Sequence, residues 1–166
     1  DAMDHLVGDL LAAARIDFEA VAPRELVAAD VARRALEIAG LSESVLLLEG
    51  DPGTLRADPT LLARALSGLL DNARRYAGTP RIRVRGRLHR VRFEVEDDGP
   101  GFPDGDAERA FQPFWRGSGP EGSAAPRGEG LGLALVRQIA QAHHGEAGGE
   151  NRPEGGARVW MELPRE

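Results

Sequence analysis

The chain has 166 residues, 42% of them hydrophobic, which is enough to bury the core of one ordinary domain. A net charge of -6, with Arg interleaved among Glu and Asp, argues against nucleic acid as a partner, and the absence of cysteine excludes disulfides and thiolate zinc sites. No apolar run reaches the roughly 20 residues that span a bilayer, and no signal-like segment opens the chain. We therefore expect a cytoplasmic domain and, because the first residue is Asp, a piece of a longer protein.

The first third of the chain predicts two helices. Residues 2–17 carry apolar side chains about every 3.5 residues, which is typical of a helix that packs against another helix. A terminal helix folded back on its own domain is the alternative. After Pro23, residues 26–38 predict a second amphipathic helix, and the apolar run of residues 45–48 follows it.

Asp58 and Pro59 open the longest predicted helix, as an N-cap residue followed by a proline in the first turn. Leu and Ala recur along it at helical spacing. We expect this helix to end near Tyr76, before Gly78.

The second half of the chain predicts a sheet with helices on one side. In residues 81–85 and 91–96, apolar residues alternate with Arg or Glu, so the sheet has one solvated face on which Arg and Glu pair across strands. Residues 97–132 are rich in Gly and Pro and predict a long loop of the kind that is either functional or disordered. An almost wholly apolar helix over 131–142 and a last alternating strand over 159–163 complete a two-layer α/β sandwich with a mixed, mostly antiparallel sheet.

Asp97 is the most informative single residue. Counting by twos from Val91 places its carboxylate on the inward face of the strand. A buried charge is costly unless a donor meets it, so either the protein or a ligand must donate to this carboxylate. The alternative is that Asp97 only caps the turn made by Gly99, Pro100 and Gly101.

Two further segments carry groups suited to phosphate and metal. Residues 127–132 lead through three glycines into the apolar helix, where glycine lets the backbone approach a ligand and the helix start offers unpaired N–H groups to an anion. On the longest helix, Asn72, Arg75 and Tyr76 share one side. They offer an amide oxygen suited to magnesium, a guanidinium suited to phosphate and a ring that can border a base, although each alone is an ordinary surface residue.

Together and in this order, these features resemble the histidine-kinase branch of the superfamily that includes gyrase, Hsp90, MutL and sensor kinases. The resemblance covers roughly residues 25–165. Four motifs carry it: residues 69–76 resemble the N box, 97–102 the first glycine box, 111–116 the F box and 128–133 the second glycine box. His143 and His144 follow at the expected distance, as helix-end residues.

The resemblance implies a Bergerat ATP-binding fold with ATP and Mg²⁺ as ligands. It implies that Asn72 coordinates magnesium, that Arg75 contacts phosphate and that Asp97 accepts a hydrogen bond from the adenine amino group. Residues 111–130 would form a lid over ATP. The other residues implied to contact ATP are Tyr76, Gly99, Gly101, Arg116, Gly128, Gly130, Leu131 and Gly132.

Gly68 departs from the family pattern. Sensor kinases usually have Asn four residues before the magnesium-binding Asn, and the ATPases of the superfamily have Glu there. Loss of that side chain predicts weaker nucleotide binding or slower turnover. It also argues against an ATPase, since no carboxylate stands there to activate water and Asp71 is turned about 100° away from Asn72 on the helix.

Residues 1–22 are similar to the end of a dimerisation and phosphoacceptor helical hairpin with its linker, and residues 23–166 to the catalytic domain. No histidine stands in the phosphoacceptor motif. The resemblance therefore implies transfer of the ATP γ-phosphoryl group to a histidine elsewhere, then to a response regulator, in a homodimeric parent protein anchored in the bacterial membrane. The alternatives are a regulatory nucleotide-binding module with weakened or lost kinase activity, which Gly68 favours, and a serine kinase of the anti-sigma type, which the helix over residues 2–17 disfavours.

Overall fold

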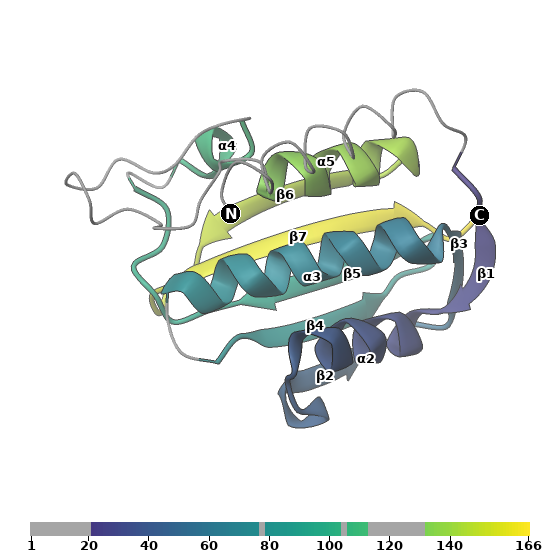
Figure 1. The fold of residues 1–166 in the computed structure, drawn as a ribbon, viewed down its shortest axis with the longest axis horizontal. Helices are drawn as coiled ribbons and strands as arrows, with labels where there is room; N and C mark the ends of the chain where they lie inside the picture. The colour runs from purple at the N-terminus through teal and green to yellow at the C-terminus, as the bar shows by residue number, and fades with distance from the viewer. Residues whose placement is uncertain (1–20, 77–78, 104–105, 113–131) are drawn as a thin grey trace.

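A five-stranded sheet in the order β2-β4-β5-β7-β6 organises the part of the chain that the computed structural model describes, residues 21–76, 79–103, 106–112 and 132–166. Its strands are β2 (Leu46–Glu49), β4 (Arg81–Gly86), β5 (Arg90–Glu96), β6 (Glu146–Asn151) and β7 (Ala157–Pro164). Strand β2 is parallel to β4, and the other neighbours are antiparallel. Helices α2 (Ala28–Ala39), α3 (Pro59–Tyr76) and α5 (Gly132–Ala142) lie on one face of this sheet (Figure 1). The predicted mixed α/β sandwich is confirmed.

A small second sheet was not predicted from the sequence. Strand β1 (Arg24–Val27) pairs with β3 (Thr54–Ala57) in an antiparallel register that matches Leu26 with Leu55. The helix predicted to begin at Leu26 therefore begins at Ala28, whose N–H donates to the carbonyl of Gly53 at 2.9 Å. The prediction was wrong there because the pairing partner lies almost thirty residues away, and a four-residue strand carries little periodicity of its own. The helix predicted over residues 2–17 lies outside the described residues.

Helix α3 has the predicted bounds. The carboxylate of Asp58 caps it, since Oδ1 accepts hydrogen bonds from the N–H groups of Thr60 at 3.0 Å and Leu61 at 3.2 Å. One stripe of the helix is fully buried against the sheet and against α2 and α5. Its members are Leu62, Ala65, Leu66, Leu69, Leu70 and Ala73. Burial of this stripe makes α3 the central helix of the domain.

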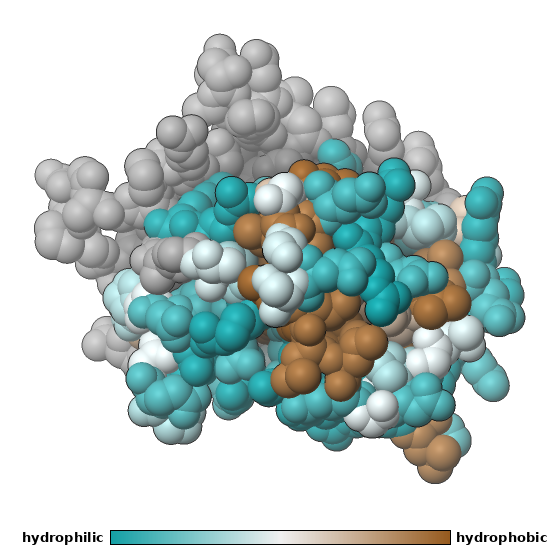
Figure 2. Space-filling view, turned by 90° about the horizontal axis from the view of Figure 1, so that it is seen from below, coloured by the Kyte–Doolittle hydropathy of each residue, from teal (hydrophilic) through white to brown (hydrophobic). Residues whose placement is uncertain are grey.

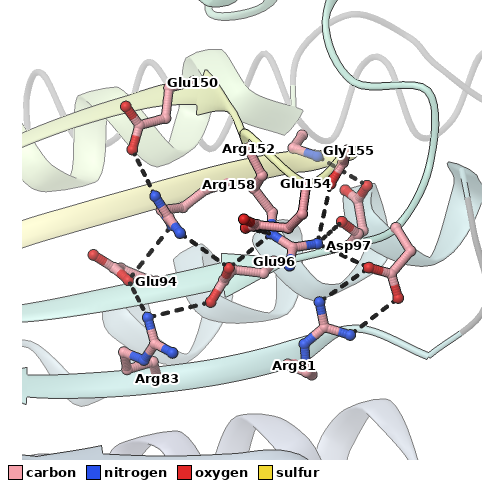
Figure 3. Close-up of polar contacts among 12 residues, drawn as sticks. Arg81, Arg83, Glu94, Glu96, Asp97, Glu150, Arg152, Glu154, Gly155 and Arg158 are labelled. Atoms are coloured by element: carbon pink, nitrogen blue, oxygen red, sulfur yellow. Dashed lines mark hydrogen bonds and ion pairs between the residues drawn. The ribbon is translucent and has the colours of Figure 1, made fainter.

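The strands alternate as predicted, but their outer face is not simply solvated. Glu94 and Glu96 are only 2% and 6% exposed, because the long side chains of arginines on neighbouring strands lie over them (Figure 3). Arg83 lies 3.6 Å from a Glu94 oxygen, and Arg158 lies 3.2 Å from a Glu96 oxygen, so Arg and Glu do pair across strands. The carboxylates of Glu94 and Glu96, predicted to be exposed to solvent, are thus buried beneath the arginine side chains that pair with them.

The glycine-rich half of the chain contains two elements that the sequence did not predict. Helix α4 (Ala107–Ala110) interrupts the loop expected over residues 97–132, and β6 forms the edge of the sheet despite Gly148 and Gly149. The apolar helix is confirmed as α5, with Leu133, Val136 and other apolar residues buried, and Leu131, the first residue predicted for it, lies outside the described residues.

An apolar area surrounds the opposite sheet edge, where β2 lies. Seen from below, apolar side chains gather on this face of the molecule (Figure 2). Ile38 on α2 and Leu47 and Leu48 on β2 are all at least 39% exposed. This area belongs to α2 and β2 and is separated from α5 by α3 (Figure 1). No helix in the described residues is long and apolar enough to cross a membrane.

Candidate functional site

Asp97 directly follows β5 and is 2% exposed, as its predicted inward position requires. Its Oδ1 atom accepts hydrogen bonds from the N–H groups of Gly99 at 2.9 Å and Ala157 at 3.2 Å. Within the described residues, no group donates to Oδ2. The two interpretations of Asp97 therefore apply to different oxygens: one caps the turn, and the other remains an acceptor at a buried position.

The turn after Asp97 is held by a residue that the sequence did not single out. Asn151, at the end of β6, accepts from the N–H of Phe102 at 2.6 Å and donates to its carbonyl at 3.1 Å. Gly101 has φ +80°, and a Cβ there would lie 2.6 Å from the Asn151 oxygen. Gly101 therefore has a conformational and a steric reason to be glycine, and Asn151 fixes the chain that leaves the site.

Two arginines hold the carboxylate next to Asp97. Arg81 donates to both oxygens of Asp98 at 3.1 Å, and Arg152 donates to Asp98 at 2.8 Å and to the carbonyl of Asp97 at 2.9 Å (Figure 3). The hydrogen bond from Arg81, and then that from Arg152, lowers the pKa of Asp98 to about 2. Sequence reasoning treated Arg81 as part of a solvated face and missed Arg152, because their partner is defined only by strand pairing.

Asn72 and Arg75 lie on the last turns of α3. Asn72 is half-buried and Arg75 is exposed, and no described residue hydrogen-bonds the Asn72 amide. One turn earlier, a Cβ on Gly68 would lie 3.5 Å from Val136 and 3.9 Å from the carbonyl of Gly132. Position 68, where this sequence has glycine in place of the family's asparagine, therefore faces the first turn of α5. The side chain of Tyr76 lies outside the description.

Helix α5 runs antiparallel to α3. Near its start, Gly132 lies beside Gly68, and beyond its end His143 reaches the beginning of α3, where its Nε2 accepts from the N–H of Asp58 at 3.0 Å. The Nδ1 of His143 lies 2.8 Å from the carbonyl of Ile139, so the buried ring is the tautomer with its proton on Nδ1. His143 is the predicted helix-end residue and also joins two helices.

The structure gathers three of the predicted groups at one end of the sandwich. The end of β5 with Asp97, the last turns of α3 with Asn72 and Arg75, and the start of α5 at Gly132 lie toward the same side (Figure 1). Four predicted contacts lie outside the described residues. They are Arg116, Gly128, Gly130 and Leu131.

A buried carboxylate after a central strand, on the same side of the sandwich as the end of one helix and the start of another, is the arrangement expected of a Bergerat ATP-binding domain. Residues 57–166 match the family described as Histidine kinase-, DNA gyrase B-, and HSP90-like ATPase. The chain belongs to this family, and within it is the catalytic ATP-binding domain of a two-component sensor histidine kinase.

Relatives and solved structures agree with this assignment. The sensor histidine kinase GtrS of Pseudomonas aeruginosa is 43% identical over 109 residues, which cover 64% of this chain and 22% of GtrS. The mycobacterial sensor histidine kinase MprB superposes with a TM-score of 0.66 at 25% identity, covering 86% of this chain and 97% of that one. Full-length ShkA in complex with AMPPNP gives 0.71 at 28% identity, covering 96% and 35%. The chain spans less than half of the curated relatives it matches.

Proposed function

We propose that this domain binds Mg-ATP between α3, α5 and the end of β5, and donates the γ-phosphoryl group to a histidine of a phosphoacceptor helical domain. The observation that carries the proposal is Asp97, a buried carboxylate with one oxygen to which no described residue donates. An adenine amino group is a donor of the required kind, so bound ATP would satisfy that oxygen.

The proposed triphosphate contacts come from α3 and α5. The Asn72 amide oxygen, to which no described residue donates, fits a hard cation that prefers oxygen ligands, and Arg75 offers an exposed guanidinium to phosphate. Bound magnesium would supply charge neutralisation on the triphosphate. Around the base and phosphates, we propose further contacts by resemblance. They come from Tyr76, Gly99, Gly101, Arg116, Gly128, Gly130, Leu131 and Gly132.

The domain division and the partners are also proposals. We propose that residues 1–22 end a dimerisation helix with its linker and that residues 23–166 form the catalytic domain, in a homodimeric parent anchored in the bacterial membrane. Histidine kinase ThkA, which shares this fold at a TM-score of 0.73, was solved in complex with the response regulator TrrA. This complex supports a response regulator as the final phosphoryl acceptor.

Gly68 favours one alternative, a regulatory nucleotide-binding module with reduced kinase activity. A Cβ at this position would lie 3.5 Å from a side-chain carbon of Val136 and 3.9 Å from the carbonyl oxygen of Gly132. These are ordinary contact distances, so the structure could accommodate a small side chain where this sequence has glycine. Hydrolysis of ATP by activated water is disfavoured, since position 68 offers no carboxylate as general base.

Calorimetry with a non-hydrolysable ATP analogue, with and without magnesium, tests the proposal on the variant Asp97→Asn. Asparagine keeps an oxygen for the N–H groups of Gly99 and Ala157 but places a donor where adenine also donates, so affinity should fall at least roughly tenfold. Asp98→Asn is the matched control, because Asp98 is exposed and pairs with Arg81. Equal affinities of wild type and Asp97→Asn would show that Asp97 does not recognise the base.

A further inference from the structure

Arg137 makes a set of contacts that the proposed nucleotide site does not use. It lies on α5, five residues after Gly132, and its side chain is 25% exposed. Its guanidinium donates to both carboxylate oxygens of Glu108 on α4, at 2.9 Å and 2.8 Å. The same group donates to the carbonyl of Ala147 on β6 at 3.1 Å. One side chain therefore joins three elements.

The flat face of the same guanidinium stacks on an aromatic ring. The central carbon of the Arg137 guanidinium lies 4.3 Å from the ring centroid of Phe111, a residue that is 3% exposed and directly follows α4. The hydrogen bonds from Arg137 also lower the pKa of Glu108. In-plane donors to a carboxylate and a carbonyl, combined with a stacked face, are offered by arginine and not by lysine.

Helix α4 depends on such contacts. It has four residues, and a single helical turn is not stable in water without tertiary support. Ala107, Ala110 and Phe111 bury its inner side, while on its outer side the Glu108 carboxylate is tied to Arg137. The elements that Arg137 joins, α4 and α5, stand immediately before and after residues 113–131 in the chain.

We propose that Arg137 is a positioning residue for nucleotide binding, which sets the place of α4 and Phe111 relative to the first turn of α5. The proposal rests on the proposed function, because it requires that the start of α5 faces the phosphates. When Arg137 no longer holds α4, only the fraction of molecules with α4 in place is competent to bind. The apparent dissociation constant for nucleotide rises in inverse proportion to this competent fraction.

The test compares Arg137→Lys and Arg137→Gln with wild type. The first readout is amide hydrogen exchange at Phe111 and Gln112, whose N–H groups donate to carbonyls within α4. The second is the dissociation constant for the Mg-ATP analogue, measured where circular dichroism shows every variant fully folded. Arg33→Lys is the matched control, since Arg33 on α2 also pairs with carboxylates but lies away from α5 (Figure 1).

We expect both Arg137 variants to exchange these amides roughly tenfold faster and to bind nucleotide roughly fivefold more weakly, with Arg33→Lys unchanged. Unchanged exchange in Arg137→Lys would overturn the proposal, as would faster exchange without loss of affinity, because either result separates the contact from nucleotide binding. If wild type itself binds no nucleotide, the proposed function fails and this proposal with it. If wild type binds nucleotide but the Arg137 variants give either of the overturning results, only the positioning role fails and the proposed function stands.

Discussion

Replacement of Gly68 by alanine tests the reasoning about α3 most directly. Glycine inside a helix is less favourable than alanine by about 1 kcal/mol. A Cβ at this position would meet Val136 at 3.5 Å and the carbonyl of Gly132 at 3.9 Å, which are ordinary contact distances. The helix gain is therefore not offset by a clash. We expect Gly68→Ala to stabilise the domain by about 0.5–1 kcal/mol, which raises Tm by roughly 1–4 °C for a domain of this size.

Thermal denaturation followed by circular dichroism measures this effect. A Tm lower than that of wild type would refute the reasoning, because it would mean that the space between α3 and α5 is closed at position 68. Gly68→Asn extends the test to function. If the missing amide limits magnesium or phosphate binding, this variant should bind the Mg-ATP analogue roughly tenfold more tightly, a gain of about 1.4 kcal/mol. A large accompanying gain in phosphotransfer would favour the reading of this domain as a weakened kinase.

Three further predictions concern the surroundings of the site. The folded pKa of Asp98, about 2, lies below its ordinary value of 3.8, so its ionised form favours the folded state above about pH 4 and this contribution is lost as pH falls toward 2. Carboxyl NMR titration should show this value in wild type and a higher one in Arg81→Gln. His143→Ala removes the hydrogen bond that joins the end of α5 to Asp58 at the start of α3, together with the bond to the Ile139 carbonyl within α5, and should cost about 2–3 kcal/mol in urea unfolding, whereas a loss below 0.5 kcal/mol would contradict the bridging role. Gly156→Ala would place a Cβ in steric clash with the carbonyl oxygen of Asp97 and should destabilise by about 3 kcal/mol or more, with an unchanged Tm as the contrary result.

Local sequence patterns were sufficient for the elements that carry strong periodicity. The cap at Asp58 predicted the start of α3 and Gly78 its end, because helix caps and helix-ending residues are properties of neighbouring residues. Alternation in β4, β5 and β7 gave the sheet and placed Asp97 on its inward face. The order of motifs around Asn72 and Asp97 was enough to indicate the family.

The contacts that support the site were decided by the tertiary structure alone. Strand pairing brings Arg152 to Asp98 across 54 residues and Asn151 to Phe102 across 49, and packing of α4 and α5 against β6 brings Arg137 to Glu108 across 29. Such partners leave no periodic trace, since each is an ordinary polar residue in its own segment. The sequence by itself determined the strongly periodic elements, the helix α3 and the strands β4, β5 and β7, and which carboxylate turns inward. The tertiary structure decided which donors meet these groups, because hydrogen bonds and ion pairs depend on distances of a few ångströms between segments far apart in the chain.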